Sequence, residues 1–224
     1  MLIPSIDLMD GKIVQLIQGK RKVLEFENFD LWVRRFSKYP LVQVIDLDAA
    51  LQRGQNLSLV AAFAGQLPCQ VGGGIRSLEQ ARSVLDMGAQ RVIIGSALFR
   101  DGEIDTEFAA QLFAEIGREH LVFAVDSRGG RIATNGWREE TSVTPIYAMN
   151  ELEAWCSGFL YTHIDTEGLM QGIPMETVRR LRSGTSRQLI VAGGIRSHEE
   201  IEQLDAINVD AVVGMAIYTE QIKV

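Results

Sequence analysis

Two aspartates stand at matching places in two similar stretches of the sequence, and carboxyl groups placed in this way can move protons. Asp7 lies within Ile6–Ile13 and Asp126 within Val125–Ile132, 119 positions later. One ionised carboxylate can remove a proton while a second, kept protonated, donates one. The alternative is that each aspartate caps a loop or pairs with a basic neighbour such as Lys12 or Arg128.

Two glycine-rich turns predict phosphate binding. Gly72–Ser77 and Ala192–Ser197 both read Gly-Gly-Ile-Arg-Ser at their ends and precede a helix start. Backbone N–H groups without an obstructing Cβ, together with the positive end of a helix dipole, form an anion site. Two later blocks, Ile93–Leu98 and Val212–Ile217, also recur. The expected phosphate-binding residues are Gly73, Gly74, Arg76, Gly95 and Ser96 on one side and Gly193, Gly194, Gly214 and Met215 on the other. The alternative is that these glycines only permit tight turns. Two such sites predict a substrate with a phosphate at each end.

Four further residues are candidates for the same site. Thr162 can hydrogen-bond a carboxylate or the substrate, or serve as a buried strand residue. Trp137 can stack on a heterocycle or anchor its loop. Arg128 and Gly168, in the loops that follow the fifth and sixth apolar runs, complete the expected binding residues. The histidines His120, His163 and His198 share no spacing, so we expect no metal site and no histidine nucleophile.

The residues above follow short apolar runs that alternate with segments of helical spacing. Continuous apolarity is typical of parallel strands buried on both faces. Ser77 with Gln80, and Ser197 with Glu200, predict capped helix starts, and Pro145 and Pro174 mark two more. The eight runs are Leu2–Asp7, Leu41–Asp48, Cys69–Ile75, Arg91–Leu98, Leu121–Arg128, Gly158–Asp165, Gln188–Ile195 and Ala211–Ile217.

Eight strand–helix units in 224 residues predict one α/β domain, a (β/α)8 TIM barrel spanning 1–224. An open doubly wound sheet is the second possibility. Four blocks recur 119 or 120 positions apart, which predicts two homologous half-barrels, 1–119 and 120–224. In such barrels the active site lies at the carboxyl ends of the strands. Tyr218–Val224 leaves room for only a short last helix.

Composition and local patterns argue against several classes of protein. A net charge of −7 argues against nucleic-acid binding through bulk charge. The two cysteines have no metal-ligand spacing, and no apolar stretch is long enough to span a membrane. Met1–Asp7 resembles a core strand rather than a signal peptide. We therefore expect a cytoplasmic protein. We also expect a monomer, and the paired glycine turns predict a small bis-phosphorylated molecule as its partner.

The chain resembles the histidine-biosynthesis isomerase family, the phosphoribosylformimino-aminoimidazole carboxamide ribotide isomerases. The resemblance extends over essentially the whole chain and is most specific at Ile3–Leu8 with Gly11-Lys12, Val44–Asp48, Gly72–Ser77, Asp126–Gly130 with Gly136-Trp137, and Ala192–Ser197. It implies a half-barrel-repeat fold and an Amadori rearrangement without a cofactor, from aminoaldose to aminoketose. It also implies that Asp7 accepts the proton, that Asp126 donates one, and that Thr162 supports the donor.

The chain departs from the family pattern in two loops. Glu167-Gly168-Leu169 stands where the family has Asp-Gly-Thr, and Gln18–Arg21 where it has Gln-Gly-Asp-Tyr. Lys20-Arg21-Lys22 is expected in the loop after the first strand, as solvated charge or as a cover for an anion. Three other functions stay open: an isomerase that also accepts phosphoribosylanthranilate, the sister cyclase of the pathway, and a non-catalytic barrel that binds phosphate ligands. Ala192-Gly193-Gly194, in place of Cys-Gly-Gly, counts against the cyclase.

Overall fold

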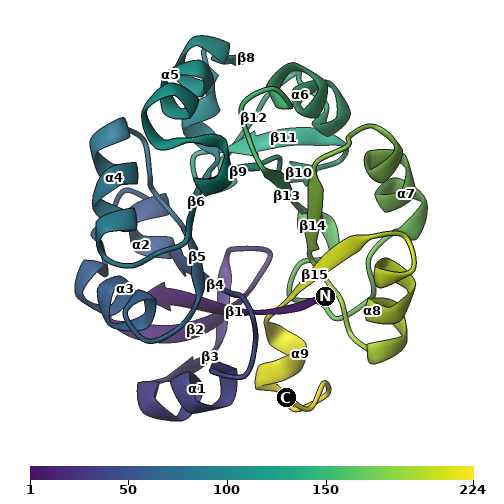
Figure 1. Ribbon diagram of the computed structural model, residues 1–224. Coiled ribbons are helices and arrows are strands. Elements are labelled where there is room, and N and C mark those ends of the chain that lie inside the picture. The colour runs from purple at the N-terminus through teal and green to yellow at the C-terminus, as the bar shows by residue number, and fades with distance from the viewer.

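Eight parallel strands close into a barrel in the computed structural model, which describes all 224 residues (Figure 1). The closure comes from β15, which pairs with β1 through Leu2–Ala211 and two following pairs. The predicted (β/α)8 barrel is confirmed, and a doubly wound sheet with two open edges is excluded. In order around the barrel the strands are β1 (Leu2–Met9), β4 (Val42–Asp46), β5 (Cys69–Gly72), β6 (Arg91–Ile94), β9 (Leu121–Ala124), β13 (Gly158–Thr162), β14 (Gln188–Ala192) and β15 (Val209–Val213).

Several strands end earlier than the apolar runs predicted. β5 stops at Gly72 rather than Ile75, and β14 stops at Ala192 rather than Ile195. The next residues, Gly73 and Gly193, have φ of 98° and 106°. These values lie outside the extended region, so the strands end there. The apolar residues beyond these glycines belong to the turns that lead into the helices.

Helices surround the barrel, and their capped starts agree with the sequence (Figure 1). The Ser77 side chain accepts the Gln80 N–H at 3.2 Å, and Ser197 accepts the Glu200 N–H at 3.3 Å. Pro145 is the first residue of its helix. The helices are α1 (Phe29–Phe36), α2 (Leu47–Ala50), α3 (Leu57–Ala64), α4 (Leu78–Asp86), α5 (Thr106–Ile116), α6 (Pro145–Leu152), α7 (Met175–Ser183), α8 (His198–Asp205) and α9 (Met215–Tyr218). None of them has both the length and the apolarity needed to pass through a membrane.

Short antiparallel strands extend the loops, and the sequence reading missed them. The β2–β3 hairpin continues the sheet from β1. Arg21 and Lys22, expected in a loop, lie in β3, and the Lys22 ammonium pairs with Glu25 at 2.9 Å. These strands are β2 (Lys12–Ile17), β3 (Arg21–Phe26), β7 (Phe99–Arg100), β8 (Glu103–Ile104), β10 (Ser127–Arg128), β11 (Arg131–Thr134) and β12 (Glu139–Glu140).

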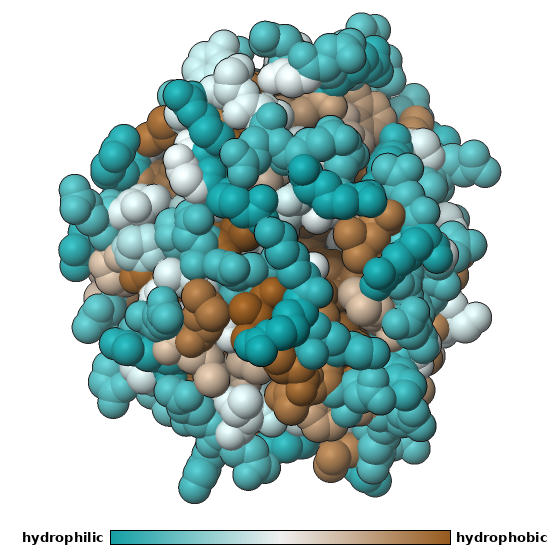
Figure 2. Space-filling model, turned by 180° about the vertical axis from the view of Figure 1, so that it is seen from behind, coloured by the Kyte–Doolittle hydropathy of each residue, from teal (hydrophilic) through white to brown (hydrophobic).

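Apolar side chains form two layers because successive strand residues point to opposite faces. Ile3, Val122 and Ile190 belong to a cluster inside the barrel, whereas Ile6 and Leu8 pack outward under the helices. The surface is mostly hydrophilic, and on the face seen in Figure 2 hydrophobic side chains gather around a central hollow.

Candidate active site

One cavity of about 220 Å³ opens at the carboxyl ends of the barrel strands. Its lining contains every residue that the sequence proposed for the site except Arg128. These residues are Asp7, Gly73, Gly74, Arg76, Gly95, Ser96, Asp126, Trp137, Thr162, Gly168, Gly193, Gly194, Gly214 and Met215.

Asp7 and Asp126 lie on opposite sides of this cavity. Asp7 belongs to β1, and Asp126 follows β9 after one intervening residue. β9 stands four places from β1 in either direction around the eight-stranded barrel. The two carboxyl groups therefore face a common space from opposing strands, as the sequence predicted.

Asp7 has a single side-chain hydrogen bond. The Ser5 hydroxyl donates to Asp7 Oδ1 at 2.9 Å. Burial raises the pKa of Asp7 to about 6, and the Ser5 hydrogen bond acts in the opposite direction. Asp7 is therefore mostly ionised near pH 7 and can accept a proton.

Asp126 is held by an aromatic donor from the next loop. The indole Nε1 of Trp137 donates to Asp126 Oδ2 at 2.9 Å, while Oδ1 is buried without a hydrogen-bond partner. Burial raises the pKa of Asp126, and Trp137 and the polar groups of Thr162 oppose the shift. The unpartnered oxygen leaves this carboxyl ready to exchange a proton with a bound molecule.

Glu167 is a third carboxyl in the cavity, and it was absent from the residues proposed from sequence. Burial, then the charge of Asp7, raises the pKa of Glu167 to about 8, and Asp126 adds to the shift. The backbones of Gly19 and Gln18 oppose it. Glu167 Oε2 is buried without a partner. The available signal was the carboxylate of Glu167-Gly168 soon after a strand, but its burial beside Asp7 depends on the turn between β2 and β3.

The glycine turns have backbone conformations and close contacts that favour glycine. A Cβ on Gly73 would lie 2.2 Å from the Asp46 carbonyl oxygen, and one on Gly193 would lie 2.4 Å from that of His163. Each turn therefore packs against the backbone of the preceding strand–helix connection. Gly95 and Gly214 open the short helices Ser96–Leu98 and α9, which border the same two sides of the cavity.

The two arginines proposed from sequence behave differently from the glycines. Arg76 lines the cavity, but its guanidinium donates to the carbonyls of Ala49 and Ala50 at 3.0 and 2.9 Å. Arg128 lies outside the cavity lining. It donates to the Trp137 carbonyl at 3.0 Å and lies 3.5 Å from Glu140. Both arginines thus hold the backbone around the site in this structure.

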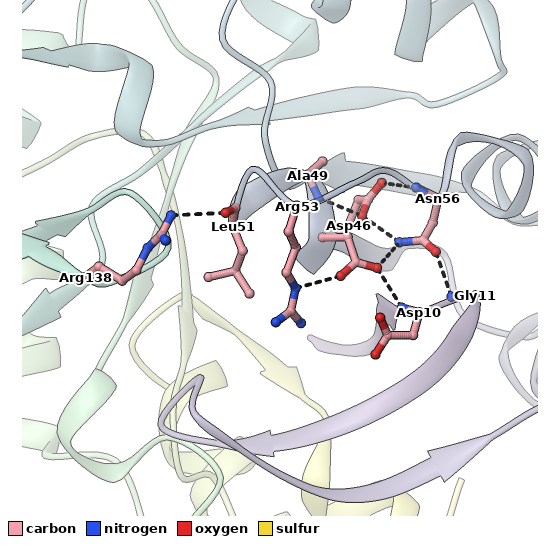
Figure 3. A network of polar contacts seen from close by, with 9 residues as sticks. Asp10, Gly11, Asp46, Ala49, Leu51, Arg53, Asn56 and Arg138 are labelled. Atoms are coloured by element: carbon pink, nitrogen blue, oxygen red, sulfur yellow. Dashed lines mark hydrogen bonds and ion pairs between the residues drawn. The ribbon is translucent and has the colours of Figure 1, made fainter.

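A polar network holds the loop after β4 against the cavity (Figure 3). The Asn56 side-chain amide donates to Asp46 at 2.8 Å and to Asp48 at 3.1 Å. Across the mouth, Arg138 donates to the Leu51 carbonyl at 3.1 Å. Leu51 lines the cavity, so the network fixes one wall of the site.

Trp137 brings two loops together over the mouth. It has a φ of 63°, which is rare for a bulky residue. A Cβ on Gly19 would lie 2.7 Å from the Trp137 ring, so the turn between β2 and β3 packs directly on the indole. A Cβ on Gly168 would lie 2.3 Å from the Leu16 carbonyl oxygen. Glycine at positions 19 and 168 thus permits the loop contacts that enclose the three carboxyls. Nowhere are three or more His, Cys, Asp or Glu side chains arranged to hold a metal ion.

Comparison with known proteins shows the family of the chain. Residues 1–223 match the model of the family described as histidine biosynthesis protein. A relative from Methanosphaera stadtmanae is 37% identical over 227 residues, which covers 97% of this chain and 93% of the relative. Relatives from Methanocaldococcus jannaschii and Thermus thermophilus are 35% and 34% identical, and cover 97% and 99% of this chain and 93% and 96% of their own. All three are named 1-(5-phosphoribosyl)-5-((5-phosphoribosylamino)methylideneamino) imidazole-4-carboxamide isomerase.

Proposed function

The chain belongs to the histidine biosynthesis protein family, and from this premise we propose that it catalyses the isomerisation for which its relatives are named. The reaction is an Amadori rearrangement, in which a bis-phosphorylated ribosyl aminoimidazole carboxamide passes from aminoaldose to aminoketose. The observation that carries the proposal is the placement of carboxyl groups on opposing strands, between two pairs of glycine turns.

The glycine turns would hold the two ends of the substrate. Their backbone N–H groups suit phosphate oxygens, and the two pairs of turns lie on opposite sides of the mouth. Binding at both ends fixes the reacting sugar between the carboxyls, so remote binding energy contributes to orientation. The Trp137 ring, which lines the cavity, would stack on the imidazole.

The proposed proton transfers need one carboxyl group that is protonated and one that is ionised. A protonated carboxyl gives its proton to the ring oxygen, the C1–O bond breaks, and the sugar opens to a Schiff base. Asp7 then removes the C2 proton, and the C–H electron pair forms the enolamine, which tautomerises to the ketone. The family resemblance assigns the donor role to Asp126. A pKa of about 8 makes Glu167 a second candidate, because it stays protonated at pH 7. We propose that the Asp126–Glu167 pair supplies the proton.

A turnover assay with the isomerase substrate tests this function. Asp7→Asn, Asp126→Asn and Glu167→Gln should each leave the protein folded, and loss of the base or of the true donor should slow turnover by a factor of about 10²–10⁴. Asp10→Asn is the matched control, because Asp10 is exposed at the end of β1 and lies outside the cavity lining. Turnover near the wild-type value in Asp7→Asn would rule out the proposed mechanism.

Phosphoribosylanthranilate belongs in the same assay as a second substrate. Turnover of both compounds would show a bifunctional isomerase. Binding of the bis-phosphorylated substrate without turnover of either would show a barrel that binds phosphate ligands and does not catalyse.

A further inference from the structure

A buried hydroxyl lies beside Asp7 on the same strand. Ser5 is 4% exposed, and its Oγ donates to Asp7 Oδ1 at 2.9 Å. Ser5 and Asp7 are two positions apart on β1, so both point to the interior of the barrel. Ala124 precedes Asp126 by the same two positions and has no polar side chain, and the hydroxyl that acts on Asp126 comes instead from Thr162 at the end of β13.

We propose that Ser5 is a positioning residue whose hydroxyl orients Asp7 and favours its ionised form, so that Asp7 is ready to act as the base. The inference rests on the proposed isomerase function. A hydrogen bond to the charged form of a carboxyl favours that form. It also occupies only Oδ1, which leaves Oδ2 of Asp7 to meet the substrate.

The backbone of Ser5 is fixed from two sides, so the position of its hydroxyl is well determined. Ser5 pairs with Gln43 of the neighbouring strand β4. From the helical side, the Tyr218 hydroxyl donates to the Ser5 carbonyl at 3.0 Å. Tyr218 is buried and packs on Trp32, with ring centroids 4.2 Å apart. Two hydrogen bonds therefore connect α9 to the carboxyl of Asp7 through Ser5.

The other ionisable groups that face Asp7 do not supply this effect. Glu167, on the loop after β13, and Tyr218, on α9, both interact with Asp7 through charge. A negative charge on either one disfavours the carboxylate of Asp7. Burial acts in the same direction, and the hydrogen bond from Ser5 is the interaction that lowers the pKa of Asp7.

The test compares Ser5→Ala with the reciprocal change Ala124→Ser. Ser5→Ala should move the acid-side midpoint of kcat/KM to higher pH by about one unit, the size expected for one hydrogen bond to a charged group. Below the midpoint this is a loss of about tenfold in rate, while KM changes less than kcat because the glycine turns carry the phosphates. Ala124→Ser should move the titration of Asp126 to lower pH. Ser5→Cys, of similar size with a weaker donor, should give an intermediate shift.

A ¹³C NMR titration of aspartate-labelled protein measures the same shift without turnover, with Asp7→Asn to assign the signal. Ser127→Ala is the matched control, because the Ser127 hydroxyl is buried 3.3 Å from that of Tyr161 and outside the cavity lining. An Asp7 signal that titrates alike in wild type and Ser5→Ala overturns the inference, even where turnover is present. Absence of turnover in the wild type would instead refute the isomerase function, while the titration still shows whether Ser5 acts on Asp7.

Discussion

At the scale of single residues, the site consists of three carboxyls that their surroundings make unequal. Burial raises the pKa of Asp7, Asp126 and Glu167 alike. The differences come from nearby donors: a serine hydroxyl for Asp7, an indole and Thr162 for Asp126, and the backbones of Gln18 and Gly19 for Glu167. Groups of one chemical type thereby become able to accept or to give a proton at the same pH.

The pH dependence of kcat/KM should be bell-shaped. Asp7 must lose its proton to act as the base, so the rate should rise as pH passes about 6. If Glu167 is the donor, the rate should fall as pH passes about 8, where Glu167 ionises. Profiles from pH 5 to 10 for wild type and Glu167→Gln test this. An alkaline limb that persists in Glu167→Gln would assign the donor to Asp126.

Glu167 should also reduce stability at alkaline pH. Its pKa in the folded protein, about 8, lies above the ordinary value of 4.5, so the folded state binds the proton more tightly. The resulting stability is complete below pH 4.5 and is lost as pH rises to about 8. Glu167→Gln should therefore raise Tm at pH 9 relative to wild type and much less at pH 5. Glu103→Gln, at an exposed strand position, is the control and should leave Tm unchanged at both pH values.

At the scale of elements, the glycine turns depend on close backbone contact as well as on their conformation. Gly193→Ala places a Cβ 2.4 Å from the His163 carbonyl oxygen, whereas Gly129→Ala, also at positive φ, places one in open space. Gly129→Ala should cost about 1–2 kcal/mol in the free energy of unfolding, and Gly193→Ala distinctly more. Urea unfolding measures both. Equal losses would contradict the packing described for the turn.

The sequence predicted those elements whose burial leaves a local pattern of apolar residues. Buried parallel strands are apolar on both faces, so all eight barrel strands stood out as continuous runs. β3 did not stand out, because its Arg21-Lys22 start faces solvent. The role of Glu167 was equally hidden from a local reading. Its environment depends on Asp7 and on Gln18 and Gly19, which lie far away in the sequence.

At the scale of the whole molecule, β15 closes the sheet onto β1, so no strand of the barrel has a free edge. Trp32 lies in α1 and Trp155 follows α6, in different halves of the chain. In a Trp137→Phe background, urea unfolding followed by fluorescence should coincide with unfolding followed by far-UV circular dichroism, as one transition. Two separated transitions would show that the halves unfold independently, against the closed packing.

The two pairs of glycine turns have one more consequence under the proposed function. Because the glycines of the two pairs of turns are alike, their backbone contacts to phosphate do not distinguish the two ends of a bis-phosphorylated molecule. A substrate bound backwards would keep both anion contacts and place the wrong carbons before Asp7, a self-inhibited complex. The orientation of the substrate must therefore be set by side chains that have no equivalent on the other side of the mouth, such as Trp137 and Glu167. Variants of these two residues should then be tested for substrate inhibition as well as for loss of rate.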